Sequence, residues 1–410
     1  MTASESSNSD PTDVRRALLV WFERHARPLP WRQNKDPYSV WVSEVMLQQT
    51  QVDTVVPYFQ RFLQAFPSVK SLARAPLERV LELWSGLGYY RRARNLHRAA
   101  QKVVQDFGGV LPSSYHEARS LPGVGDYTAR AVLSIAYNQP YAVVDGNVAR
   151  VVSRLRALHG NLHQQKFSRA LDEELELIFS RRQPGRFNQA IMELGQSICL
   201  PRAPKCPLCP LRRMCQAHRD GAPEAYPEPR PRRANETRYL ATAVLYHAHG
   251  GWLRPLGLRS RITQGNNADL PISQVPVCAS QGAQARLAKP LQVALGLGLD
   301  EGLMEGLWNF PAAFGSSPGE ALSRLQARLG NMKPGNVRWE SRSGLPRSLA
   351  QLRHAITYRS IVVDVYAGEV SGKSVKHPLR WFSVSRLPQS AVSSLARKIA
   401  EKIVAVRSAN

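Results

Sequence analysis

The chain has 410 residues, of which 43% are hydrophobic, and it carries 55 Lys and Arg against 31 Asp and Glu. At about 100–200 residues per domain, this length predicts two or three domains, and no apolar run reaches the roughly 18 residues of a membrane-spanning helix. The formal charge of +24 favours nucleic acid over a membrane surface as partner, because the basic residues are spread along the chain. The polar segment 1–10 has neither the apolar core of a signal peptide nor the Arg-rich helix of a mitochondrial import signal, so we expect a disordered tail on a soluble intracellular protein.

The first half of the chain predicts helices only. Asp36 and Pro37 have the residue types of an N-cap and first helical position, and apolar residues from Val42 to Leu63 recur at helical spacing. No alternating strand pattern occurs before about residue 235. We therefore expect an all-α domain over residues 11–216. Its further helices are predicted at 72–84, 93–107, 115–121, 127–137, 146–159, 167–179 and 187–199.

A change in composition separates the two halves. Residues 217–238 are rich in Pro, Arg and Glu and poor in apolar side chains, which is typical of a linker. Residues 253–300 match no pattern that can be placed. The second domain, residues 239–406, is expected to be mixed α/β. Its predicted strands are 239–246 and 360–366, and its predicted helices are 322–329 and 391–406.

Four of the five cysteines lie close together in the sequence. Their spacing is Cys199-x6-Cys206-x2-Cys209-x5-Cys215, and Cys278 stands apart. Clustered cysteines in a long intracellular chain point to metal rather than to disulfides. Four thiolates can hold an iron–sulfur cluster or a tetrahedral zinc ion, and this spacing matches neither a zinc ribbon nor a ferredoxin. The residues alone leave iron–sulfur and zinc open.

A glycine-containing turn and an aspartate downstream of it are candidate functional segments. Residues 121–125, LPGVG, precede a helix that begins near Asp126, where free N–H groups suit a phosphate. On the glycines alone, an ordinary helix–turn–helix connection explains this segment better. About twenty residues downstream, Asp145 stands before a Gly-Asn pair, where aspartate is by default a turn residue or N-cap. A carboxylate near a helix N-terminus stays ionised.

Several segments together resemble one known family. The cysteine spacing resembles the [4Fe–4S] loop of the endonuclease-III-like DNA glycosylases, and LPGVG resembles their helix-hairpin-helix element. WVSEVMLQQTQV, residues 41–52, resembles the MutY-type adenine glycosylases in particular, as do LPWR at 29–32 and DPY at 36–38. The resemblance is strong over residues 21–215 and weaker over residues 239–406. It implies a [4Fe–4S] cluster on Cys199, Cys206, Cys209 and Cys215.

The resemblance also implies two catalytic carboxylates, Glu44 and Asp145. Adenine leaves poorly unless a ring nitrogen is protonated, and breaking the N-glycosidic bond builds positive charge on the deoxyribose. One carboxyl group must donate a proton and another must stay negative beside the cation. Glu44 matches the family's general acid, which partial burial would keep protonated, and Asp145 matches the group that stabilises the cation. Whether Asp145 bonds covalently to the sugar stays open.

Other matched positions imply contacts with DNA. Gln49 and Tyr89 resemble residues that wedge into the duplex beside the base opposite the adenine. A core aromatic is the alternative interpretation of Tyr89 and the preferred one of Tyr90. Bifunctional members carry a Schiff-base lysine where this chain has Tyr127, so we expect a monofunctional enzyme that leaves an abasic site. The remaining expected contacts with the base or the DNA are Arg32, Gly123, Gly125, Asn147 and Glu193.

The second domain resembles the Nudix-like domain of this family, which recognises 8-oxoguanine opposite the adenine. The resemblance rests on GLMEGLWNFP, residues 302–311. A hydrolytic Nudix domain binds Mg²⁺ with Arg-Glu-x-x-Glu-Glu, whereas residues 319–324 read GEALSR, so no pyrophosphohydrolase activity is expected. The family's recognition loop, His-x-Phe-Ser-His, is replaced by HAITY at 354–358, which keeps a hydroxyl at Thr357 but loses its neighbours. A simple hairpin is the alternative interpretation of this loop.

The sequence thus predicts a monomeric, monofunctional adenine DNA glycosylase that acts on adenine opposite 8-oxoguanine or guanine in duplex DNA. The expected location is the cytoplasm, in association with the nucleoid, in a bacterium, or the nucleus or mitochondrion in a eukaryote. A first alternative is a glycosylase of the same fold for thymine opposite guanine, against which the Glu44 segment speaks. A second is a non-catalytic iron–sulfur DNA-binding protein, against which Glu44 and Asp145 together speak.

Overall fold

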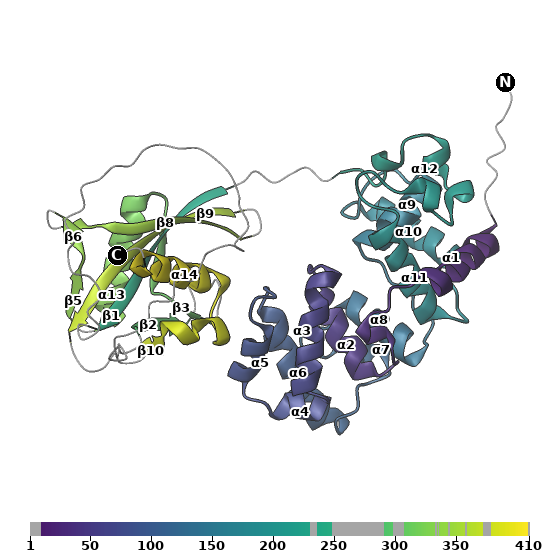
Figure 1. Ribbon diagram of the computed structural model, residues 1–410. Helices are drawn as coiled ribbons and strands as arrows, with labels where there is room; N and C mark the ends of the chain where they lie inside the picture. Colours follow the sequence, from purple (N-terminus) through teal and green to yellow (C-terminus); the bar gives the residue numbers. More distant parts are fainter. Residues whose placement is uncertain are drawn as a thin grey trace, which may run out of the picture. The chain divides into compact units, whose positions relative to one another are not determined.

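The computed structural model divides into two compact units, residues 1–233 and 234–410 (Figure 1). Among the described residues, no helix is long and apolar enough to cross a membrane. Residues 1–9, Cys278, residues 302–306 and Thr357 lie outside the described part of the chain. The structure describes residues 10–229, 236–247, 291–297, 307–332, 334, 336–342, 345–356, 359–371 and 379–408.

The first unit confirms the predicted all-α domain, since residues 10–229 contain helices and no strand. Its helix α1 is absent from the sequence-based expectations, although Asp10 caps it and accepts a hydrogen bond from Thr12 N. The helices are α1 (Pro11–His25), α2 (Pro37–Leu47), α3 (Val52–Ala65), α4 (Val69–Arg74), α5 (Leu77–Trp84), α6 (Arg91–Phe107), α7 (Tyr115–Arg119), α8 (Asp126–Tyr137), α9 (Gly146–Arg156), α10 (Gln165–Ile178), α11 (Pro184–Ser197) and α12 (Gln216–Arg219).

Two segments with continuous helical spacing are each broken into two helices. The segment 72–84 divides between α4 and α5 because Pro76 disfavours helical geometry at Ala75, whose ψ is 144°. The segment 42–63 divides between α2 and α3, where Gln48 leaves the helix and Gln49 adopts a left-handed φ of 58°. The apolar spacing continues across both breaks, so hydrophobic periodicity alone does not reveal them.

Helix α2 lies in the centre of the first unit. The carboxylate of Asp36 caps it by accepting hydrogen bonds from Tyr38 N and Ser39 N. All residues from Tyr38 to Met46 are buried, and the helix packs against α3 and α8. Helices α8 and α11 cross closely, because a Cβ added at Gly185 would lie 2.4 Å from Ser134 O. Any charged side chain on α2 is therefore removed from water.

The second unit is a mixed sheet between two helices, which confirms the expected α/β composition (Figure 1). Its main path runs β10-β2-β1-β9-β5, with β1 parallel to β9 and the other neighbours antiparallel. The described strands are β1 (Glu236–His247), β2 (Gln292–Leu297), β3 (Trp308–Asn309), β4 (Ala312–Gly315), β5 (Asn336–Trp339), β6 (Ser341–Arg342), β7 (Leu345–Pro346), β8 (Ser348–Ile356), β9 (Arg359–Ser371) and β10 (Leu379–Ser383), and the helices are α13 (Pro318–Met332) and α14 (Ser394–Ser408).

Successive side chains of β1 point to opposite faces of the sheet and so contribute to both hydrophobic cores of this unit. Leu240 and Val244 face the cluster that contains residues of α14, and Ala241 and Leu245 face the cluster that contains residues of α13. Strand β2 lies within residues 253–300, for which the sequence suggests no pattern. It is short, and its position depends on pairing with β1 and β10.

The segment 217–238 is only partly the linker that its composition suggests. Its first part is packed onto the helical unit: Arg154 Nε donates to Tyr226 O at 2.9 Å, and the Tyr226 ring lies 5.2 Å from that of His159. Glu228 N donates to Gly160 O at 2.9 Å. These contacts order a proline-rich stretch that has few apolar side chains of its own.

Candidate active site

Glu44 is a buried acid on helix α2, with 6% of its surface exposed. Burial is the main reason that its pKa rises from 4.5 to about 7, and the negative charge of Asp145 adds to the rise. A hydrogen bond with Tyr127 and the charge of Arg32 act in the opposite direction. Glu44 therefore keeps its proton to a higher pH than an exposed glutamate does, as a general acid requires.

Asp145 is held in place by the N-terminus of helix α9. Its Oδ1 accepts hydrogen bonds from Asn147 N at 2.8 Å and from Val148 N at 2.7 Å, and its Oδ2 accepts from Asn147 Nδ2 at 2.8 Å. These donors and the helix dipole stabilise the ionised carboxylate. Because the charge of Asp145 acts on both Glu44 and Tyr127, the three groups share one site.

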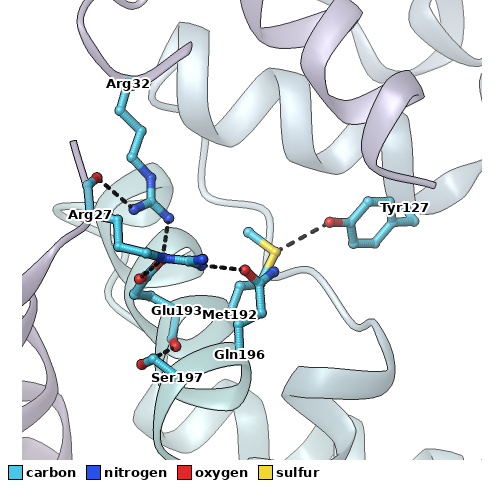
Figure 2. A network of polar contacts seen from close by, with 7 residues as sticks. All are labelled: Arg27, Arg32, Tyr127, Met192, Glu193, Gln196 and Ser197. Carbon is cyan, nitrogen blue, oxygen red and sulfur yellow. Dashed lines mark hydrogen bonds and ion pairs between the residues drawn. The ribbon is translucent and has the colours of Figure 1, made fainter. Parts of the chain in front are cut away.

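Tyr127, on helix α8, contacts Glu44 on α2 and Met192 on α11. Its hydroxyl donates to Met192 Sδ at 3.2 Å and hydrogen bonds with Glu44 (Figure 2 shows the contact with Met192). Burial and the neighbouring carboxylates raise its pKa well above 10, so the phenol stays protonated. The site therefore holds a neutral hydrogen-bond donor at position 127.

Glu193, on helix α11, gathers two arginines around a carboxylate that is 1% exposed (Figure 2). Arg27 Nε and Nη2 bind its two oxygens at 2.5 and 3.1 Å, and Arg32 Nη2 binds Oε2 at 2.8 Å. Arg27 also donates to Gln196 Oε1 at 2.6 Å. Burial lowers the pKa of Arg32, and the Glu193 carboxylate offsets only part of this effect. The buried Arg32 Nε has no partner among the described residues and remains a free donor.

Gln49 and Tyr89 share an unusual backbone geometry. Both are non-glycine residues in the left-handed region, at φ 58° and 48°, and both are exposed, Tyr89 by 50%. L-residues adopt this geometry at a cost. Tyr90 is buried, and its hydroxyl accepts a hydrogen bond from Gly86 N, so its expected place in the core is confirmed.

The glycines of LPGVG have different structural roles. Gly123 adopts φ 77°, and a Cβ there would lie 2.6 Å from Asn95 Cβ, so both conformation and space require glycine. Gly125 is the N-cap of α8, and nothing lies within 4 Å of a Cβ added there. The backbone at the start of α8 is therefore open to a phosphate-sized group.

The four clustered cysteines are free thiols that lie in one loop after helix α11. Burial raises the pKa of Cys209 to about 12, and the charges of Cys199, Cys215 and Cys206 add to this, which places all four near one another. Arg154, 2% exposed, donates to Cys199 Sγ at 3.4 Å. Among the described residues, no three His, Cys, Asp or Glu side chains are arranged to hold a single metal ion. An all-sulfur set of four donors fits an iron–sulfur cluster chemically.

Comparison with known proteins gives the family. Residues 42–176 match the HhH-GPD superfamily of base excision DNA repair proteins. The chain is 33% identical over 414 residues to the adenine DNA glycosylase of Rattus norvegicus, in an alignment that covers 96% of this chain and 78% of that protein. The chain belongs to the adenine DNA glycosylase family. That of Buchnera aphidicola subsp. Acyrthosiphon pisum is 39% identical over 238 residues, which cover 58% of this chain and 68% of that protein. The solved structure of a thermostable thymine-DNA glycosylase is 26% identical in sequence. Its alignment covers 53% of this chain and 100% of that chain, with a TM-score of 0.47.

Membership of the adenine DNA glycosylase family confirms the resemblance inferred from residues 41–52. The structure brings Glu44, Asp145, Tyr127 and Arg32 into electrostatic contact. Thr357 lies outside the described residues. Sequence reasoning missed three polar side chains, and the only local signal is that one of them lies two positions before LPWR. They are Arg27, Gln196 and Arg92.

Proposed function

We propose that this chain removes adenine from DNA in base-excision repair by hydrolysing the N-glycosidic bond of adenine opposite 8-oxoguanine or guanine. The observation that carries the proposal is the buried acid Glu44, with a pKa of about 7, beside the helix-capping carboxylate of Asp145. Two carboxyl groups in such different surroundings divide into a proton donor and a stabilising anion.

Each carboxyl group has one role in the proposed reaction. Glu44 donates its proton to a ring nitrogen of adenine, and the electron pair of the bond to C1′ leaves with the base. The Asp145 carboxylate stabilises the positive charge that develops on the sugar, held toward it by the N-terminal donors of α9. Water then adds at C1′ and releases a proton to the Glu44 carboxylate, which restores the acid.

The adenine would be recognised by the arginine pair around Glu193. The free Arg32 Nε suits a ring nitrogen that accepts a hydrogen bond, and the Glu193 carboxylate suits an exocyclic amine. Arg27 holds Glu193 from the other side. A base without that amine, such as thymine, lacks this hydrogen bond to the Glu193 carboxylate and is disfavoured.

The proposed enzyme is monofunctional. Helix α8, DYTARAVLSIAY, contains no lysine, and the buried phenol of Tyr127 cannot form a Schiff base with the sugar. The product would be an abasic site in an otherwise unbroken strand. One monomer of the protein is proposed to bind one lesion in duplex DNA.

Cys199, Cys206, Cys209 and Cys215 are proposed to hold a [4Fe–4S] cluster. When bound, the cluster cross-links the loop and leaves no open iron position, so its role here is structural. Exposed basic side chains lie beside this loop and suit phosphate contact. They are Arg202, Lys205, Arg212 and Arg213.

The second unit is proposed to be a Nudix-like domain that contacts 8-oxoguanine. Support comes from the motif at 302–311 and from the hairpin of β8 and β9, between which Thr357 lies in the sequence. In place of a Mg²⁺-binding cluster, α13 carries Glu320, which accepts a hydrogen bond from Ser316 N at 2.7 Å and pairs with Arg324. Hydrolysis of nucleoside diphosphates is therefore not part of the proposal.

A cleavage assay tests the proposal. An end-labelled duplex with adenine opposite 8-oxoguanine is incubated with wild type and with Glu44→Gln, then treated with or without hot alkali. Alkali-dependent cleavage by wild type that disappears in the variant is expected. Cleavage without alkali, or borohydride trapping in high yield, would contradict monofunctionality. A folded wild type that is inactive here and cleaves at thymine opposite guanine would establish the first alternative, and inactivity on both the second.

A further inference from the structure

Arg92, in the first turn of α6, lies between two loops with its guanidinium surrounded by carbonyl oxygens. Nη1 donates to Val45 O at 3.0 Å, to Met46 O at 2.8 Å and to Gln48 O. Nη2 donates to Thr50 Oγ1 at 3.0 Å and to the carbonyls of Leu87 and Gly88 at 3.4 and 3.3 Å. One planar group thus binds the last turn of α2, the segment that follows it and the segment before α6.

Two of the carbonyl groups that Arg92 binds lie next to Gln49 and Tyr89, the two residues with left-handed backbone geometry. Gln48 O directly precedes Gln49, and Gly88 O directly precedes Tyr89, so Arg92 binds the peptide group on the N-terminal side of each. The guanidinium carbon also lies 5.4 Å from the centre of the Tyr89 ring. Since non-glycine residues leave this geometry readily when unsupported, the two conformations need such fixation.

We propose that Arg92 is the positioning residue that fixes Gln49 and Tyr89 relative to each other, so that both side chains enter the duplex as one wedge. This inference rests on the role that the family resemblance implies for Gln49 and Tyr89 and that we propose here, which is to enter the duplex beside the base opposite the adenine. A planar guanidinium with donors on two nitrogens can bind both loops at once, whereas a lysine ammonium offers one point of attachment. Arg92 does not touch the reacting atoms, so its effect on excision passes through the wedge.

The test uses Arg92→Lys in the full chain. The probe is a duplex with 8-oxoguanine opposite 2′-fluoro-2′-deoxyadenosine, which resists hydrolysis, and 2-aminopurine next to the 8-oxoguanine, whose fluorescence rises when the wedge unstacks it. We expect Arg92→Lys to lose most of this rise and to lower the single-turnover excision rate about tenfold or more, with affinity for undamaged duplex unchanged within about twofold. Arg98→Lys, on the exposed face of the same helix, is the matched control and should behave as wild type.

A double-mutant cycle separates positioning from a general effect on the fold. In a chain that already carries Gln49→Ala and Tyr89→Ala, adding Arg92→Lys should lower the rate by less than about twofold, because the wedge is gone. An equal loss in both backgrounds overturns the inference. If Arg92→Lys does not fold, Thr50→Val removes one acceptor of the same guanidinium and is expected to show a smaller loss of the same kind.

The outcomes distinguish this inference from the proposal beneath it. If the Gln49→Ala and Tyr89→Ala chain keeps the full fluorescence rise, the wedge itself is refuted and the role of Arg92 falls with it. If that chain loses the rise while Arg92→Lys keeps it, only the positioning role is refuted. Loss of the rise in both, with non-additive rates, supports it.

Discussion

Replacing Tyr127 with phenylalanine should shift the pH dependence of adenine excision to higher pH. In the wild type the Tyr127 hydroxyl hydrogen bonds with Glu44 and lowers the pKa of that acid, which burial raises to about 7. The deprotonated acid cannot donate, so kcat/KM should fall above about pH 7. Tyr127→Phe removes a bond that favours the carboxylate, and Glu44 should then hold its proton to higher pH.

The size of the shift follows from the hydrogen bond. A hydrogen bond to a charged group contributes roughly 1.5–3 kcal/mol, and one pKa unit corresponds to about 1.4 kcal/mol, so the expected range is about one to two units. The single hydroxyl proton is also directed at Met192 Sδ, 3.2 Å away, so we expect the lower end. The alkaline limb should move from about pH 7 to about pH 8.

The assay is kcat/KM for adenine excision measured across the pH range, since this quantity reports the pKa of the free enzyme. Tyr137→Phe is the matched control, because it removes a hydroxyl from the same helix, where it donates to Leu111 O instead. The alkaline limb of the pH profile of Tyr137→Phe should lie at the same pH as in the wild type. A limb of Tyr127→Phe that does not move, or moves to lower pH, would refute the assignment of Glu44 as an acid tuned by Tyr127.

Three further predictions concern stability and the cluster. The pKa of Glu44 is higher in the folded than in the unfolded protein, so its contribution to stability is complete below about pH 4.5 and is lost as the pH rises through about 7. Glu44→Gln lacks this pH dependence. The free energy of unfolding of the variant minus that of the wild type, measured with urea, should therefore increase by up to about 3 kcal/mol between pH 4.5 and pH 8. Gly185→Ala should destabilise the helical unit by about 1–3 kcal/mol, since the new Cβ meets the α8 backbone, whereas Gly330→Ala in open helix should slightly raise the thermal midpoint of its unit. Cys199→Ser should abolish absorbance near roughly 400 nm and bound iron, while Cys278→Ser, outside the cluster, should keep both; iron bound by Cys199→Ser as in wild type would argue against the ligand set.

Arg27 shows what a sequence cannot disclose about the adenine pocket. Apart from its place two positions before LPWR, nothing in its neighbourhood distinguishes it from the other basic residues, and its partner Glu193 lies 166 positions away in the chain. Arg92 is similar, because all but one of its acceptors are backbone carbonyls, which carry no sequence signature. Both residues acquire their roles only when distant helices bring them to a partner.

The sequence by itself determined the local features of this protein. Asp36 and Pro37 start helix α2, and the residues of segment 41–52 are sufficient to indicate the family, because capping and motif identity depend on neighbours in the chain. Only the tertiary structure decided that Glu44 is buried and tuned by Asp145 and Tyr127, and that α2 ends before Gln49. The physical reason is range: desolvation and electrostatic coupling are set by groups that fold in from elsewhere, whereas a helix cap acts within one turn.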